Sequence, residues 1–147
     1  MEFLMRPIGE IHTHFIDKRD TPIQASRSTA TGQVEVYPAY VARLRDLDGF
    51  SHIILLYAFH RSSEYTLSVT PFLDDQERGL FATRYPERPN PIGLSIVRLL
   101  NVHDNLLDIE GADMLDGTPL LDIKPYVPEF DVRTDERSGW YAARLKA

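Results

Sequence analysis

The sequence predicts a mostly β fold, a small antiparallel β-barrel with one or two short helices. Short β-prone runs follow one another at close spacing, turn residues separate them, and helical patterns are scarce. The alternation of strands and helices that builds a dinucleotide-binding domain is missing, as is any G-x-G-x-x-G motif. Closure into a barrel would protect the edges of these strands. The 147 residues, 43% of them hydrophobic, suit one compact domain over residues 1–147.

In the N-terminal half, β-prone runs alternate with polar connections. Phe3–Phe15 alternates loosely between apolar and polar residues and is predicted to begin the domain as a strand. Residues 17–32 are polar and predict a loop. A short strand is expected at 33–37, and Pro38 is then predicted to begin a short helix that runs to Leu47. The continuous apolar run at 51–60 indicates a buried central strand.

In the C-terminal half, further β-prone runs are joined by tight turns. His103-Asp104-Asn105 is typical of a hairpin connection, and Asp116-Gly117 of a turn before a strand. The end of the chain, 140–145, is predicted to be either a short docked helix or an edge strand. The strands expected in this half are 67–72, 80–83, 93–102, 106–111 and 118–123.

The composition excludes several classes of protein. No apolar run approaches the roughly 18 residues of a membrane-spanning helix and no secretory signal is visible, so we expect no membrane association and a cytoplasmic location. The chain has no cysteine, which excludes disulfides, thiolate metal sites and a cysteine nucleophile. The formal charge is −6, but residues 104–136 alone hold 10 acidic against 2 basic residues. Arginines elsewhere can therefore form a local positive patch.

The segment from Phe81 to Ser95 reads F-A-T-R-Y-P-E-R-P-N-P-I-G-L-S and is the most unusual part of the chain. Its three prolines fix their own backbone angles and favour extended geometry in the residues before them. Arg84 and Arg88 offer planar cationic groups suited to carboxylates or phosphates. The segment predicts a preorganised binding loop. A structural alternative is that the two arginines only pair with nearby acids to fix the loop.

This segment resembles the signature of the TsaA-like family, which includes tRNA methyltransferase O. Three further stretches, at 8–11, 49–53 and 111–126, fit the same family, so that the resemblance covers most of the chain. It implies a β-barrel that binds S-adenosylmethionine across a homodimer, with the pocket shared between the chains. It also implies an S-adenosylmethionine-dependent methyltransferase that acts on the N6 of threonylcarbamoyladenosine next to the tRNA anticodon.

Site residues follow from the resemblance position by position. Where the family usually has Pro-Arg-Gln, this chain has Pro-Ile-Gln at 22–24. The catalytic candidates, as base or for orientation, are Asp113 and Tyr126, and the expected substrate contacts are Arg88, Asn90 and Lys124. The implied cofactor-binding residues are Pro22, Ile23, Gln24, His60, Arg61, Arg84, Leu94, Asp113, Met114, Leu115 and Asp116.

Other interpretations of these residues stay open. Asp113 and Asp116 are typical turn formers, and Lys124 and Tyr126 suit packing roles equally well. Longer members of the family carry an additional C-terminal tRNA-binding domain, which we expect to be absent here. A non-catalytic module that binds or senses S-adenosylmethionine, or a methyltransferase of another acceptor, is therefore an alternative function.

His12 and His14 are the candidate metal-ligating histidines. His12 and His14 are spaced to share one face of a strand, which would present two imidazoles together. No third ligand is evident nearby in the sequence. We therefore expect no metal site.

Overall fold

The computed structural model describes residues 1–17, 28–61, 68–69 and 76–145. The chain divides into two compact units, which are described separately. The first, here called the barrel unit, comprises Met1–Arg61 and Ile92–Tyr126. The second unit comprises Ser62–Pro91 and Val127–Ala147. The expectation of one domain over residues 1–147 stays a prediction.

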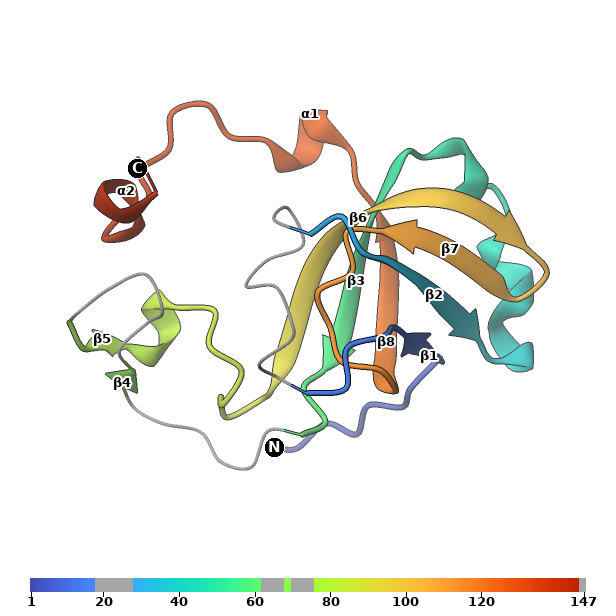
Figure 1. The fold of residues 1–147 in the computed structure, drawn as a ribbon, viewed down its shortest axis with the longest axis horizontal. Helices are drawn as coiled ribbons and strands as arrows, with labels where there is room; N and C mark the ends of the chain where they lie inside the picture. The colour runs from blue at the N-terminus through green and yellow to red at the C-terminus, as the bar shows by residue number, and fades with distance from the viewer. Residues whose placement is uncertain (18–27, 62–67, 70–75, 146–147) are drawn as a thin grey trace. The chain divides into compact units, whose positions relative to one another are not determined.

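The barrel unit is a closed antiparallel β-barrel, which confirms the predicted fold class (Figure 1). Its strands follow one another around the barrel in the order β1-β2-β7-β6-β3-β8. Every neighbouring pair is antiparallel. Because the barrel is closed, each of these six strands pairs with a neighbour on both sides. The strands are β1 (Gly9–His12), β2 (Thr31–Val36), β3 (His52–Ala58), β6 (Ile92–His103), β7 (Leu106–Glu110) and β8 (Thr118–Pro125).

Most of the predicted strands are confirmed, although their lengths differ. The hairpin of β6 and β7 turns where it was expected, and Asp104 adopts the left-handed conformation with φ of 55°. The first strand is shorter than the predicted Phe3–Phe15. The apolar run of β3 is not buried on both sides, because each strand of a single-layered barrel has one outer face. Ile53, Leu55 and Tyr57 point into the core, and the residues between them are half-buried.

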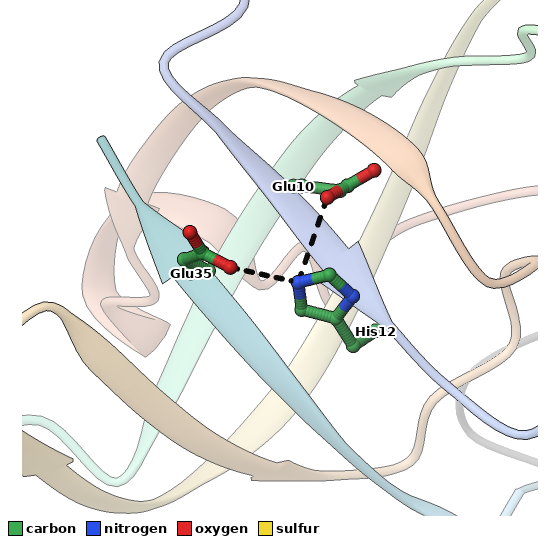
Figure 2. A group of neighbouring side chains, drawn as sticks. All are labelled: Glu10, His12 and Glu35. Carbon is green, nitrogen blue, oxygen red and sulfur yellow. Dashed lines mark hydrogen bonds and ion pairs between the residues drawn. The ribbon is translucent and has the colours of Figure 1, made fainter.

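Register places polar side chains together on the outer face of β1 and β2. Glu10 lies directly opposite Glu35 on the neighbouring strand. His12 follows two residues after Glu10 and therefore projects from the same face. Figure 2 shows the three side chains converging, with both carboxylates directed at Nε2 of the His12 ring. The sequence places Glu10 and Glu35 far apart, and only the strand pairing joins them.

The predicted helix from Pro38 to Leu47 forms as two short 3-10 helices. The first, η3 (Pro38–Leu44), begins with proline in its first turn, as expected. Asp46 then adopts a left-handed conformation with φ of 70°, which ends the first helix before η4 (Leu47–Gly49). Leu44 is the buried residue that attaches this segment to the core.

The second unit contains short elements only. They are β4 (Ser68–Val69), β5 (Arg78–Gly79), η5 (Leu80–Ala82), α1 (Pro128–Asp131) and α2 (Tyr141–Arg144). The tail docks on the segment around η5, since Trp140 Nε1 donates a hydrogen bond to the Ala82 carbonyl at 2.8 Å. Of the two alternatives for the end of the chain, the short helix is the one formed. The predicted strand at 67–72 lies outside the described residues except for β4.

The predicted strand at 80–83 is wrong. Leu80 is buried, and the hydroxyl of Thr83 donates a hydrogen bond to the Leu80 carbonyl at 2.7 Å. The Thr83 amide also bonds to that carbonyl, which closes a 3-10 turn instead of an extended run. Among the described residues, no helix has the length and apolar character that a membrane crossing requires.

Gly93 allows two aromatic rings to fill the barrel interior. A Cβ atom built on Gly93 would overlap the Tyr57 ring and come within 2.9 Å of Cζ of Phe59. Gly93→Ala should therefore lower the free energy of unfolding by about 1–3 kcal/mol, the usual cost of overpacking. Chemical denaturation measures the change. Gly49→Ala is the matched control, because a Cβ there meets no atom within 4 Å. Equal stability of the two variants would contradict this account.

Candidate functional site

Residues 111–117, here called the acidic turn, connect β7 to β8 and carry Asp113 and Asp116. Gly117 has φ of 81°, a conformation that L side chains rarely adopt, and its amide donates to the Ile11 carbonyl. The backbone amides of residues 111 and 112 both donate to the carbonyl of residue 30, and that of residue 116 donates to residue 15. The acidic turn is thus attached to two other segments of the barrel unit.

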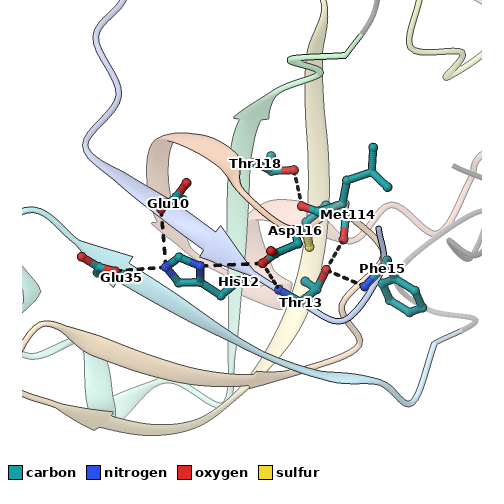
Figure 3. A network of polar contacts seen from close by, with 9 residues as sticks. Glu10, His12, Thr13, Phe15, Glu35, Met114, Asp116 and Thr118 are labelled. Atoms are coloured by element: carbon teal, nitrogen blue, oxygen red, sulfur yellow. Dashed lines mark hydrogen bonds and ion pairs between the residues drawn. The ribbon is translucent and has the colours of Figure 1, made fainter. Parts of the chain in front are cut away.

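Hydroxyl side chains bind three carbonyls of the acidic turn. Thr13 Oγ1 donates to the Met114 carbonyl at 2.8 Å, and Thr118 Oγ1 donates to the carbonyl of residue 115 at 2.6 Å (Figure 3). Ser28 Oγ donates to the carbonyl of residue 112 at 2.6 Å. Four amides and three carbonyls of the turn are therefore hydrogen-bonded within the protein, which constrains the backbone that carries the two carboxylates.

Asp113 is held by a relay of buried hydroxyls. Tyr57 Oη and Ser95 Oγ lie 2.8 Å apart, and Ser95 Oγ donates to Asp113 Oδ1 at 2.6 Å. Ser95 is 2% exposed and Tyr57 4%, so water does not compete for these bonds. Ser95 is the last residue of the proline-rich signature segment. The relay therefore joins the proline-rich segment to the acidic turn, which are separate in the sequence.

The other predicted residues of the acidic turn have distinct environments. Met114 is buried in the core and Leu115 packs against it, so their side chains hold the turn in place. Asp116 is exposed, and its Oδ1 accepts a hydrogen bond from the Thr13 amide at 3.1 Å. Asp116 is therefore the carboxylate of the turn that is open to solvent.

The predicted cationic loop belongs to the second unit. Arg88 Nη1 donates to the carbonyls of Thr83 and Tyr85, and its guanidinium lies over the Phe81 ring. Arg88 thus stabilises its own loop by hydrogen bonds to backbone carbonyls. The structural alternative for this arginine had predicted acidic side chains as its partners. Arg84 and Asn90 are both exposed. That this loop meets the acidic turn stays a prediction, as do the substrate contacts of Arg88 and Asn90.

Several predicted cofactor residues lie at the surface of the barrel unit. His60 is exposed just beyond β3, and Arg61 Nη1 donates to the Ile16 carbonyl at 2.7 Å. Leu94 points outward from β6 and is 46% exposed. Pro22, Ile23 and Gln24 lie outside the described residues.

Asp113 and Tyr126 are attached at different positions along β3. Tyr126 lies beside His52, the first residue of β3, with ring centroids 6.2 Å apart. Asp113 is bonded to Ser95, which lies opposite Leu55, three residues further along β3. A shared catalytic role for Asp113 and Tyr126 stays a prediction.

Lys124 is a fully exposed cation on β8. Its Nζ lies 2.9 Å from Asp122 Oδ2, and this hydrogen bond, together with the charge of Asp122, raises the pKa of Lys124. Lys124 therefore stays protonated near neutral pH. It suits contact with an anionic group and not proton abstraction.

Sequence reasoning missed Tyr57 and Ser95 as site residues. The available signal was the alternation along β6, which puts Gly93, Ser95 and Val97 on its inner face. A serine at an inward position between apolar residues needs a hydrogen-bonding partner. Its partner, Asp113, lies 18 positions away and was already a candidate.

Comparison with known proteins decides the family. Residues 10–132 match the model of the tRNA-methyltransferase O N-terminal domain. The chain belongs to this family. The expected resemblance is thereby confirmed, and the acidic turn and the whole proline-rich segment fall inside the matched region of the tRNA-methyltransferase O domain.

Relatives of the domain are found in archaea, bacteria and a mammal. A probable S-adenosyl-L-methionine-binding protein of Pyrococcus abyssi is 55% identical over 136 residues, which are 92% of this chain and 74% of that protein. The tRNA (adenine(37)-N6)-methyltransferase of Mus musculus is 37% identical over 87% of this chain and 32% of its own length. The crystal structure of TrmO from Pseudomonas aeruginosa matches with a TM-score of 0.80 and 40% identity over 95% of this chain. This chain spans 62% of that solved chain.

The Tyr57–Ser95–Asp113 relay should contribute measurably to stability. Ser95→Ala removes the hydroxyl between two buried polar groups, so we expect the free energy of unfolding to fall by about 1–3 kcal/mol. Urea denaturation measures the change. Ser51→Ala is the control, because Ser51 bonds to its neighbour His52 at an exposed position and should change stability by less than about 0.5 kcal/mol. A Ser95 variant as stable as the control would show that the relay is not a strong constraint.

Proposed function

We propose that this protein is an S-adenosylmethionine-dependent methyltransferase that methylates the N6 of threonylcarbamoyladenosine next to the tRNA anticodon. The observation that carries the proposal is the Ser95 to Asp113 hydrogen bond, which joins the two signature segments of the tRNA-methyltransferase O family at a rigid acidic turn. The mouse relative, named as a tRNA adenine-37 N6-methyltransferase, supports the acceptor. A tRNA acceptor also supports the expected cytoplasmic location.

The residues present fit the donor. When bound, S-adenosylmethionine supplies a methyl group on a positively charged sulfur, together with a ribose diol and a zwitterionic amino acid. Asp116 offers an exposed carboxylate on a turn whose backbone is already bonded, which suits a diol or an ammonium group. Arg84 offers an exposed guanidinium, which suits a carboxylate. Little ordering is then needed on binding, because the turn is preorganised.

We assign the role of general base to Asp113. Its Oδ1 is directed by the Ser95 hydroxyl, so the orientation of the carboxylate is set before substrate arrives. The acceptor nitrogen must lose a proton on methylation, and a positioned carboxylate can take it. Alignment then supplies much of the remaining barrier reduction. Arg88, Asn90 and the Lys124 cation are the proposed contacts to the anionic groups of the acceptor.

A non-catalytic donor-binding module is the second candidate. It is favoured by the charge distribution, since residues 104–136 hold 10 acidic against 2 basic residues and repel a tRNA backbone. The Pyrococcus relative is named as a binding protein and not as an enzyme. Donor binding is common to both candidates, and methyl transfer separates them.

We also propose that the protein is a homodimer with pockets shared between its chains. Leu94 and Ile96 project from the outer face of β6 and are 46% and 40% exposed in the described structure. Register places them opposite Leu56 and Ile54 of β3, which gives a continuous apolar stripe. A second copy of the chain would cover this stripe. Leu94 would then line a pocket for S-adenosylmethionine between the two chains.

Donor binding and methyl transfer should respond differently to the two aspartates. Asp113→Asn should lower turnover about 100-fold or more, the usual effect of losing a general base. Asp116→Asn should instead weaken donor affinity about 10-fold, because it removes a charged acceptor. Isothermal titration with the donor, and transfer of labelled methyl groups to unfractionated tRNA, measure the two effects.

Asp108→Asn is the control, since Asp108 pairs with His103 in the β6–β7 hairpin, away from the acidic turn. Absence of donor binding in the unmodified protein would refute both candidate functions. Intact binding without transfer would leave the binding module.

A charged residue introduced on the apolar stripe should dissociate the proposed dimer. Ile96→Glu places a carboxylate in the centre of the stripe, so we expect light scattering after size exclusion to change from the mass of two chains to that of one. Phe50→Glu is the control, because Phe50 lies before β3 and outside the stripe. A monomeric unmodified protein would contradict the dimer.

A further inference from the structure

The outer face of β1 and β2 carries a group of metal-ligating atoms that the donor site does not use. His12 Nε2 lies 3.0 Å from Glu35 Oε1 and 3.6 Å from Glu10 Oε2 (Figure 2). The ligand atoms of the three residues all lie within 4.8 Å of one another. All three side chains are about two-fifths exposed, so an ion can reach them from solvent.

The arrangement brings like charges together. Glu10 and Glu35 are directly opposite on paired strands, a position in which two carboxylates destabilise a sheet. Asp116 adds a third carboxylate on the other side of the His12 ring. In the part of the chain that the structure describes, no lysine or arginine lies within ion-pair distance of Glu10 or Glu35. Three carboxylates thus surround one imidazole, an arrangement of acidic groups that a divalent cation would balance.

The distances fit one coordination sphere. Divalent zinc binds histidine nitrogen and carboxylate oxygen at about 2.0–2.2 Å with tetrahedral geometry, which separates neighbouring ligand atoms by about 3.4 Å. The two separations from His12 Nε2, 3.0 and 3.6 Å, bracket that value. The separations from His12 Nε2 are therefore compatible with one coordination sphere.

The other nitrogen of His12 has a suitable partner. Nδ1 lies 3.7 Å from Asp116 Oδ1, and Asp116 is held in turn by the Thr13 amide (Figure 3). Without an ion, Nε2–H donates a hydrogen bond to Glu35 Oε1 at 3.0 Å, because an ionised carboxylate only accepts. A bound ion would take the place of that proton, and the ring proton on Nδ1 would then face Asp116. Nδ1 of the ring therefore faces Asp116, and Nε2 faces the oxygens of Glu10 and Glu35.

We propose that Glu10, His12 and Glu35 bind a divalent first-row transition ion, with Zn²⁺ as the reference ion. One imidazole and two carboxylates suit such an ion better than an all-oxygen cation, and at least one coordination position stays open to solvent. The site replaces the expectation of no metal. That expectation considered His14 as the second ligand, but His14 lies beyond the end of β1. The proposal is independent of the methyltransferase function.

The test is calorimetric titration of the untagged protein with Zn²⁺. We expect saturable one-to-one binding that falls about 10-fold or more in His12→Ala and in Glu35→Gln. Asp116→Asn should weaken Zn²⁺ binding about 10-fold without removing a ligand, the usual effect of losing the partner of a ligating histidine. Co²⁺ should give the visible absorption of a site with a nitrogen ligand.

Controls separate this site from ordinary surface binding. His103→Ala removes a histidine that faces one carboxylate, Asp108, and should leave Zn²⁺ affinity unchanged. Glu35→Gln changes charge with almost no change of shape, so it keeps the test valid if His12→Ala fails to fold. The proposal is overturned by non-saturable binding, by equal Zn²⁺ affinity in the Glu35 variant, or by Mg²⁺ binding as tightly as Zn²⁺.

Discussion

The hydrogen bond from Ser95 to Asp113 is the constraint on which the candidate site depends. It requires β6 to present Ser95 inward, which in turn requires the strand pairing that places Gly93 against the Tyr57 ring. A side chain at position 93 would displace that ring, and with it the hydroxyl that meets Ser95. The proline-rich signature and the acidic turn are therefore coupled through barrel packing, although they are separate in sequence.

The same coupling explains why the barrel interior tolerates polar groups. A buried hydroxyl without a partner destabilises a fold, and Tyr57, Ser95 and Asp113 satisfy one another in series. The acidic turn is bonded in the same thorough way by Thr13, Thr118 and Ser28. Polar residues thus bind the backbone of a connection that has no strand partner of its own.

Local patterns in the sequence were sufficient for the strands and insufficient for the contacts between them. β6 and β7 were predictable because alternation and a turn signal coincide. The strand at 80–83 was not, because Thr83 bonds to Leu80 through both its amide and its hydroxyl and closes a turn. Asp113 was identified by resemblance, but its partner Ser95 depends on which face of β6 is buried. The pairing of Glu10 with Glu35 depends on register, which no local pattern specifies.

The two aspartates of the acidic turn have different surroundings, which agree with the different roles proposed for them. Asp113 accepts a short bond from a buried hydroxyl, so its carboxylate has a fixed direction, as a proton acceptor requires. Asp116 is exposed, and its Oδ1 accepts from the Thr13 amide and lies 3.7 Å from His12 Nδ1. An exposed carboxylate can bind a ligand from solvent, so the surroundings of Asp116 suit the role proposed for it in donor binding.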